Sequence, residues 1–270
     1  NDDLEELVLL GDMSDNCQIL VKDHGASLRL HLDRSLPKVL GLKDLGAIHC
    51  SNILEIDFAQ ILNNYPNLRE LRLWGKPGNI LNFHKLSELK ELINFSTVDL
   101  FGFTAEDIPK PEDLPQLSMF WMSSLPEDAA KVAKKYYKKQ QDKGLNLWIT
   151  KPRKAEWLAQ NLDNPFRSWD GQENISTADA KKAVALYRKT RASLIKLLEN
   201  PNEDTMKHIE VLIREYTQGF NKMDKRNCFI ETIEREDIYD ALVEILDLLP
   251  EDLGMDKEKF IEIFDELKDF

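Results

Sequence analysis

Cysteine and long apolar runs are scarce in this chain of 270 residues, and basic residues are fewer than acidic ones. The three cysteines, Cys17, Cys50 and Cys228, are odd in number and far apart, which fits neither a disulfide framework nor a metal knuckle. We therefore expect a reducing, cytoplasmic location. No apolar run approaches the roughly 20 residues that a membrane-spanning helix needs, so we expect no membrane partner.

Basic residues are outnumbered by acidic ones, and the balance varies along the chain. The net charge of -12 opposes general binding to nucleic acid, because phosphate groups would be repelled. Residues 231–270 hold fifteen acidic and four basic residues, a net of -11, whereas residues 131–154 are strongly basic. The sequence therefore predicts a polarised protein with an acidic C-terminal tail.

Motifs that carry catalysis are also missing. There is no H-E-x-x-H, no G-x-G-x-x-G, no phosphate loop and no G-x-S-x-G. His24 and His31 come near each other in the sequence, but two imidazoles without a third ligand indicate a metal only weakly. We expect no catalytic residue, no metal and no cofactor.

A repeat is present in the first half, with its clearest copy at Leu68–Leu73 (Leu-Arg-Glu-Leu-Arg-Leu). The L-x-x-L-x-L spacing recurs imperfectly from Leu42, Leu92 and Leu114. The second anchors fall at 45, 71, 95 and 117, in steps of 26, 24 and 22 residues. These steps suit leucine-rich repeats, and a further alternating strand follows at Leu145–Ile149.

These residues resemble the leucine-rich-repeat superfamily, in a short and irregular form, over about residues 40–150. The resemblance implies a solenoid with one parallel sheet, helices or loops outside it, and a partner on the concave sheet face. Leu68–Leu73 and Leu114–Met119 match the consensus spacing best. The asparagine usual after the strand is absent, since Gly75-Lys-Pro-Gly follows one strand and Met122-Ser-Ser another.

Residues 1–40 precede the repeats, which we place at residues 41–150. The alternation in Leu28–Leu32 and the turn-like Lys22–Gly25 before it predict a hairpin with Ile19–Val21 that caps the repeats. The apolar segment Leu4–Leu10 suits either a short helix or a strand.

The remaining residues predict helices. A linker helix and a polar, aromatic loop occupy residues 151–175, and we place the domain junction at Asp163–Gly171 because of its turn signals. Residues 176–270 contain four amphipathic segments, the first capped by Ser176 and stopped by Asn200-Pro201. Each apolar stripe needs a neighbour, so a helical bundle follows. The predicted fold class is therefore α/β: a short irregular leucine-rich-repeat solenoid followed by an all-α helical bundle domain.

Aromatic and charged side chains on the repeat strands are the best candidates for function. Strict alternation along the second and fourth repeat strands decides which side chains face outward. The predicted partner-binding residues are Glu70, Arg72, Trp74, Ser118 and Phe120. Tryptophan and arginine are typical of interface hot spots. The alternatives are that the aromatic rings belong to the core or that the helical half covers them.

Two charged segments are further candidates. Glu231, Glu234, Glu236, Asp237 and Asp240 could hold a metal or serve acid–base chemistry, or they could favour the start of a helix and its hydration. The lysine-rich segment 131–143 could bind an acidic partner, or it could form a solvated outer surface. In both cases the second interpretation is favoured.

The sequence thus predicts a non-enzymatic, intracellular protein–protein interaction module. It would bind a protein through the concave face, as an immunity-type or regulatory protein whose acidic tail steers a basic partner. The alternative is a hydrolase or metal-dependent enzyme with its site at Asp163–Asp170 or Glu231–Asp240. A self-associating structural subunit is a third possibility.

Overall fold

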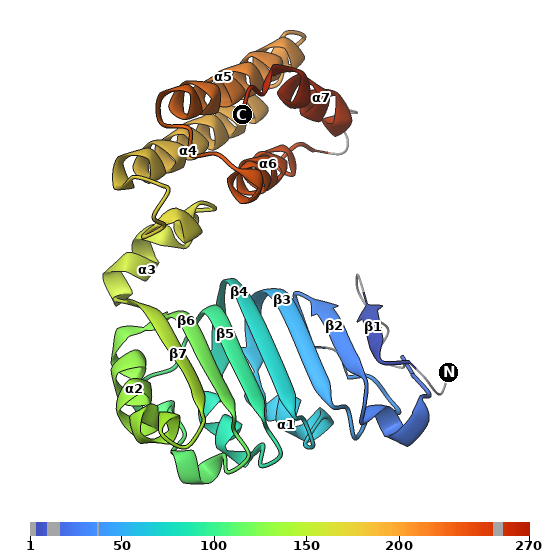
Figure 1. The fold of residues 1–270 in the computed structure, drawn as a ribbon. Coiled ribbons are helices and arrows are strands. Elements are labelled where there is room, and N and C mark those ends of the chain that lie inside the picture. The colour runs from blue at the N-terminus through green and yellow to red at the C-terminus, as the bar shows by residue number, and fades with distance from the viewer. Residues whose placement is uncertain (1–3, 10–16, 37, 251–255) are drawn as a thin grey trace. The chain divides into compact units, whose positions relative to one another are not determined.

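A computed structural model describes residues 4–9, 17–36, 38–250 and 256–270 of the chain (Figure 1). The chain divides into two compact units, Asn1–Leu162 and Asp163–Phe270, each with its own hydrophobic core. The division falls at the first residue of the loop in which the sequence places the junction. Within the described residues, no helix combines the length and the apolar character that crossing a bilayer requires.

The first unit is α/β and is built on a seven-stranded parallel sheet whose strands follow the order of the chain (Figure 1). Each strand pairs in parallel with the next. The strands are β1 (Glu6–Leu9), β2 (Arg29–Asp33), β3 (Ala47–Asp57), β4 (Glu70–Leu81), β5 (Asn94–Phe101), β6 (Met119–Pro126) and β7 (Asn146–Arg153).

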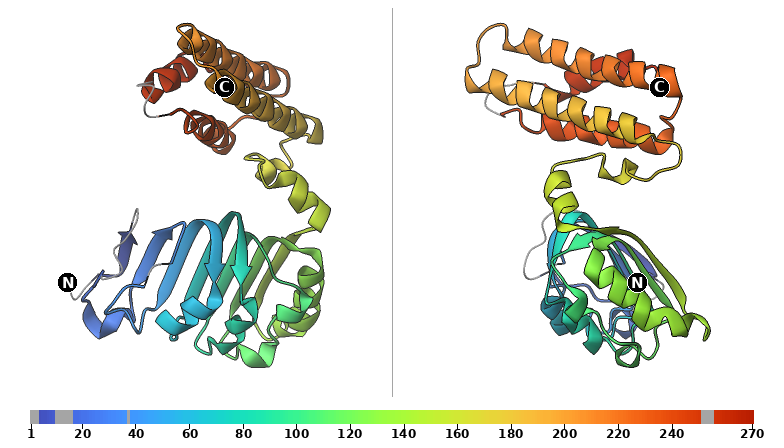
Figure 2. Two further views of the ribbon diagram at one scale, coloured as in Figure 1. Left: turned by 180° about the vertical axis from the view of Figure 1, so that it is seen from behind. Right: turned by 90° about the vertical axis from the view of Figure 1, so that its left-hand side faces the viewer.

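Helices and short 3-10 turns connect the strands and cover one face of the sheet (Figure 2). They are η1 (Lys22–Gly25), α1 (Phe58–Asn64), η2 (Phe83–Glu88), η3 (Ala105–Asp107), η4 (Pro111–Asp113) and α2 (Glu127–Gln141), and α3 (Ala155–Asn161) follows β7. Phe58, Ala133 and Tyr137 bury their side chains from this side. We call this the covered face, and the opposite one, which carries the alternate side chains of each strand, the open face.

The covered face is a continuous apolar layer. Its central row runs across the strands through Ile48, Leu71, Phe95, Phe120 and Leu147. The rings of Phe95 and Phe120 stack with centroids 5.6 Å apart, and Phe120 also lies 4.5 Å from the ring of Tyr137. The repeat anchors predicted at Leu45 and Leu117 are therefore wrong by three residues, because Ile48 and Phe120 align with Leu71.

A left-handed backbone residue recurs at the same register position in most strands. The non-glycine residues with φ between 47° and 67° include Arg34, Asn52, Asp99, Ser124 and Lys151. Each directly follows one member of the paired row Asp33, Ser51, Val98, Ser123 and Thr150. Such a conformation costs roughly 1–2 kcal/mol for a residue with a side chain, so its repetition shows that the same bend is imposed strand after strand.

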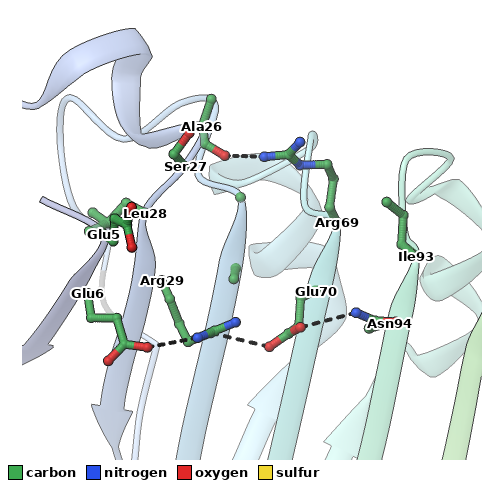
Figure 3. Close-up of a pocket in the computed structure, with 12 residues that line it drawn as sticks. Glu5, Glu6, Ala26, Ser27, Leu28, Arg29, Arg69, Glu70, Ile93 and Asn94 are labelled. Atoms are coloured by element: carbon green, nitrogen blue, oxygen red, sulfur yellow. Dashed lines mark hydrogen bonds and ion pairs between the residues drawn. The ribbon is translucent and has the colours of Figure 1, made fainter. Parts of the chain in front are cut away.

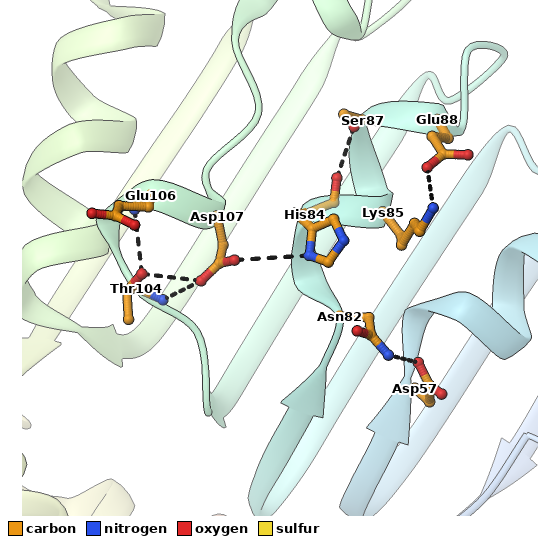
Figure 4. A network of polar contacts seen from close by, with 9 residues as sticks. All are labelled: Asp57, Asn82, His84, Lys85, Ser87, Glu88, Thr104, Glu106 and Asp107. Atoms are coloured by element: carbon orange, nitrogen blue, oxygen red, sulfur yellow. Dashed lines mark hydrogen bonds and ion pairs between the residues drawn. The ribbon is translucent and has the colours of Figure 1, made fainter.

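Asparagine side chains donate hydrogen bonds to aspartate carboxylates on the neighbouring strand or turn. Asn82 donates to Asp57 over 2.9 Å, and the same Asp57 oxygen accepts from the Ala59 amide and so caps α1 (Figure 4). Asn52 likewise donates to Asp33, and Asn67 to Asp44, each over 2.8 Å. These pairs connect residues 19–25 positions apart in the sequence, about one strand-to-strand spacing.

The N-terminal segment differs from the expected capping hairpin. Ile19–Val21 is not a strand, and Gln18 forms only an isolated parallel bridge with Leu40. The apolar segment at Leu4–Leu10 instead supplies β1, which pairs in parallel with β2; Leu10 itself lies outside the described residues. A hairpin requires antiparallel neighbours, and β2 is parallel to both of its own.

Within its described residues the second unit contains four α-helices, at the positions where the apolar stripes predict them. They are α4 (Thr177–Glu199), α5 (Thr205–Asn227), α6 (Thr232–Leu246) and α7 (Lys257–Leu267), and the short turn η5 (Arg167–Trp169) precedes them. Ser176 caps α4 by accepting the Asp179 amide. Phe166 and Trp169 are buried in the core of this unit, so the predicted linker loop is part of its packing.

Candidate functional site on the open face of the sheet

Three of the five predicted partner-binding residues point to the open face from β4. Leu71 and Leu73 are fully buried on the covered face, so the period of two turns Glu70, Arg72 and Trp74 the other way. Trp74 is 48% exposed, whereas Glu70 is 8% exposed. Glu70 and Arg72 are thus placed together on the open face, with Trp74 beyond them along the strand.

The other two predicted residues lie elsewhere. Phe120 is fully buried on the covered face, so its prediction as an outward residue is wrong. The strand register decides this, because Phe120 pairs with Phe95, an inward residue. Ser118 precedes β6 and is exposed, and its hydroxyl lies 3.3 Å from both the Ile93 carbonyl and the Asn94 amide oxygen.

Tryptophan is the dominant exposed side chain of the open face. Trp121 and Trp148 point outward from β6 and β7 with 37% and 50% exposure, and their rings lie 5.9 Å apart at the centroids. Sequence reasoning did not assign either to the site. The signal for Trp148 was available, since it stands between the inward residues Leu147 and Ile149. With Trp74, three of the five tryptophans of the chain are exposed on this face.

The open face has an uncharged part. The outward side chains of β5, β6 and β7 over the first three outward positions carry no formal charge: Asn94, Ser96, Val98, Met119, Trp121, Ser123, Asn146, Trp148 and Thr150. In a protein with 31% charged residues, nine neighbouring surface positions on a sheet without one charged side chain are unusual. Depletion of charge and enrichment in tryptophan are the compositional signals of an interface.

Charged side chains gather on the other part of the open face, at the start of β1, β2 and β4. The guanidinium of Arg29 lies between two carboxylates, 2.8 Å from Glu6 and 3.3 Å from Glu70 (Figure 3). Arg72 Nε approaches the same Oε1 of Glu70 at 3.1 Å, and Asn94 donates to its other oxygen over 3.2 Å. These residues, Arg72 excepted, line a hollow of about 340 Å³ along the strand starts.

The ionisation of Glu70 reflects these neighbours. Burial raises its pKa, but the hydrogen bond from Asn94 and the charges of Arg72 and Arg29 outweigh burial, so the pKa of Glu70 is lowered overall. The two arginine Nε atoms are close to Oε1 without hydrogen-bond alignment. Their contact with Glu70 is therefore ionic attraction, in which one carboxylate serves two guanidinium groups.

Two histidines extend this charged region toward Trp74. His31 and His49 stand on adjacent strands with ring centroids 5.0 Å apart, and His49 lies 5.9 Å from the ring of Trp74. Burial, and then the nearby charge of Arg72, lower the pKa of His49 to about 4, so its ring is neutral at pH 7. Together with Arg72 and Ser51, these rings line a small hollow of about 80 Å³.

The acidic run that the sequence offered as an alternative site has structural roles. Asp237 accepts the indole N–H of Trp169 over 2.8 Å, and Glu234 accepts from Asn174 over 3.1 Å and from the Glu231 amide over 3.0 Å. These bonds hold the loop after Asp163 against the start of α6. Glu236 and Asp240 are exposed.

The lysine-rich segment forms α2, and its lysine side chains are exposed while Ala129, Ala130, Ala133 and Tyr137 are buried. This is the arrangement of an outer, solvated helix.

Cys50 is buried beside Ser35, and burial raises the pKa of its thiol to about 12, which disfavours a reactive thiolate.

In the part of the chain that the structure describes, no cluster of side chains provides a ligand set for a metal ion. No group of three or more histidine, cysteine, aspartate or glutamate side chains there could hold an ion.

Comparison with known proteins adds no family: no family model, no curated protein and no solved structure matches this chain. The site is therefore interpreted from its own geometry.

Proposed function

We propose that this chain is a non-enzymatic, intracellular interaction module that binds a protein partner through the open face of its sheet. In this proposal the first unit is a short, irregular leucine-rich-repeat solenoid and the second a helical bundle. The parallel order of the strands, the row from Ile48 to Leu147 and the recurring left-handed residue support a repeat.

The observation that carries the proposal is the exposure of Trp74, Trp121 and Trp148 on one sheet face. A monomeric surface rarely exposes such large apolar rings together, and tryptophan dominates binding energy where it becomes buried. The neutral amides and hydroxyls around Trp121 and Trp148 can donate and accept hydrogen bonds. Burying them does not carry the desolvation penalty of a charged group. This combination suits a protein surface that is itself apolar and polar rather than highly charged.

The acidic tail adds a kinetic element to the proposal. Residues 231–270 carry a net charge of -11, and long-range attraction of this kind raises association rates with a basic protein. The specific form we favour is an immunity-type or regulatory protein whose acidic tail attracts a partner that is basic overall, while the open face contacts a part of that partner that is not highly charged. Residues 251–255 of this tail lie outside the described residues.

The test is capture of a partner from the native host. The wild-type protein would retain one protein in stoichiometric amount. The triple variant Trp74→Ala/Trp121→Ala/Trp148→Ala would lose it, because each buried tryptophan at an interface contributes about 2 kcal/mol or more. The matched control is Tyr136→Ala, which removes an aromatic ring of 36% exposure from helix α2.

Circular dichroism and urea unfolding would show that all variants remain folded. Equal capture by the triple variant and the control would overturn the open face as the binding surface. Loss of capture in the Tyr136→Ala control alone would direct attention to α2 instead.

A further inference from the structure

Arg72 is a basic side chain of the open face whose charge is less well matched than that of Arg29. Its Nε shares the single oxygen Oε1 of Glu70 with Arg29, and Arg29 has Glu6 as a second carboxylate. Within the residues that the structure describes, the terminal nitrogens of Arg72 have no hydrogen-bond partner. Its side chain is 35% exposed, so a second carboxylate can reach it.

The surroundings of Arg72 form a receiving site. A hollow of about 80 Å³ is lined by its side chain, by His31 and His49, by Ser51 and by the ring of Trp74. The Nε2 atoms of both histidines are buried and have no hydrogen-bond partner among the described residues, and Nε2 of His49 lies 3.8 Å from Oε1 of Glu70. Buried polar atoms without partners are uncommon, and here both belong to side chains that line one hollow with a guanidinium.

From this geometry we infer that the hollow binds the carboxylate of an acidic side chain, presented by the protein partner. A planar guanidinium fork matches a carboxylate through two parallel hydrogen bonds. A neutral imidazole can donate one further N–H, and Ser51 can donate its hydroxyl. Trp74 supplies an apolar wall for the methylene groups that carry the carboxylate.

A cation fits this hollow less well than an anion. Arg72 and Arg29 place two positive charges near the histidines, and the carboxylate of Glu70 is already engaged by both. A phosphomonoester carries up to two negative charges and three terminal oxygens, whereas Arg72 supplies the only guanidinium among the residues that line the hollow. The occupant is therefore one carboxylate, held beside the exposed tryptophans of the same face.

The inference rests on the proposed function only for the source of the carboxylate, so the hollow can be tested without a partner. Acetate and inorganic phosphate are titrated separately into the full chain at pH 6.5. The ring signals of His31 and His49 and the indole signal of Trp74 are followed by NMR. We expect saturable shifts of these signals with acetate, and weaker or no shifts with phosphate.

Two variants give the test its specificity. Arg72→Gln would weaken acetate binding by about tenfold or more, because the charge-assisted pair is lost. Arg34→Gln removes an exposed guanidinium at the end of β2, next to its own partner Asp33, and would leave binding unchanged.

Three outcomes would overturn the inference: no saturable shift in the wild type, equal acetate binding by Arg72→Gln, or tighter binding of phosphate than of acetate. The wild-type titration alone decides the first and third, even if Arg72→Gln were to unfold. If acetate fails to bind while partner capture still depends on the tryptophans, the carboxylate site falls and the proposed function stands.

Discussion

The two faces of the seven-stranded sheet are made by alternate residues of the same strands, and they differ sharply. On the covered face, Phe95 and Phe120 are fully buried and stacked. On the open face, one residue further along, Trp121 is exposed beside Trp148. The covered face is explained by packing, whereas packing within the unit does not explain large exposed rings. The difference shows that packing is concentrated on the covered face, and we propose that binding uses the open one.

The largest effect expected from this comparison is on the covered face. Phe120→Ala should lower the free energy of unfolding by roughly 3–5 kcal/mol, because it leaves a cavity between Phe95 and Tyr137. Trp121→Ala, its immediate neighbour, should change it by less than about 1 kcal/mol. Urea unfolding of both variants measures the contrast. Similar losses in the two variants would show that Trp121 is also a packing residue.

A second prediction concerns acid. The pKa of His49 is about 4 in the folded protein, below its ordinary value of 6.5. The unfolded chain therefore binds more protons between these values, so stability should fall as the pH drops from 6.5 to 4. The expected loss is roughly 2 kcal/mol after allowance for the partial exposure of the ring.

His49→Gln should remove this part of the pH dependence when unfolding is measured across the same range. The charged and titratable groups that act on His49 are Arg72, His31, Glu70 and Arg29. An unchanged pH dependence in His49→Gln would contradict the burial of this ring beside Arg72.

The smallest effects should separate two carboxylates, Glu70 on the open face and Asp237 in the second unit. The lowered pKa of Glu70 means that its contribution is present above its unfolded pKa and is lost as the pH falls through the folded value. Glu70→Gln should therefore cost about 1–2 kcal/mol at pH 7.

Asp237 has the opposite sign. Burial raises its pKa, although Trp169 and Ser168 donate to it, so its contribution is present at low pH and is lost as the pH rises through the folded value. Asp237→Asn keeps an oxygen acceptor for Trp169 and should cost close to nothing at pH 7. Unfolding of both variants at pH 7 tests the contrast, and a larger loss from Asp237→Asn than from Glu70→Gln would reverse it.

The sequence predicted the helices of the second unit and most strands of the first, because their apolar periods of 3.6 and 2 are regular. It placed the fourth repeat incorrectly because Leu114, Leu117 and Phe120 are three residues apart, so that two L-x-x-L-x-L alignments are possible. Pairing with Phe95 across the sheet selects the second alignment. Pairing between strands is a tertiary property that spacing within one strand cannot supply.

The candidate site was also predictable only in part, where it depends on alternation within one strand. Alternation around Leu71 and Leu73 correctly put Glu70, Arg72 and Trp74 on one face. The cluster of His31 and His49 was missed, since the residues are eighteen positions apart and meet only because β2 and β3 pair in parallel. The predicted hairpin gave β2 an antiparallel neighbour, so the parallel pairing of β2 with β3 was not considered.

The measurement that tests the central claim most directly is the response of the indole N–H signals to the captured partner. Trp74, Trp121 and Trp148 report on the open face, and Trp169, bonded to Asp237 in the second unit, is an internal reference. We predict saturable shifts of the three open-face indoles at a one-to-one ratio, with Trp169 unchanged. A shift of Trp169 with the three open-face signals unmoved would contradict the assignment of binding to the open face.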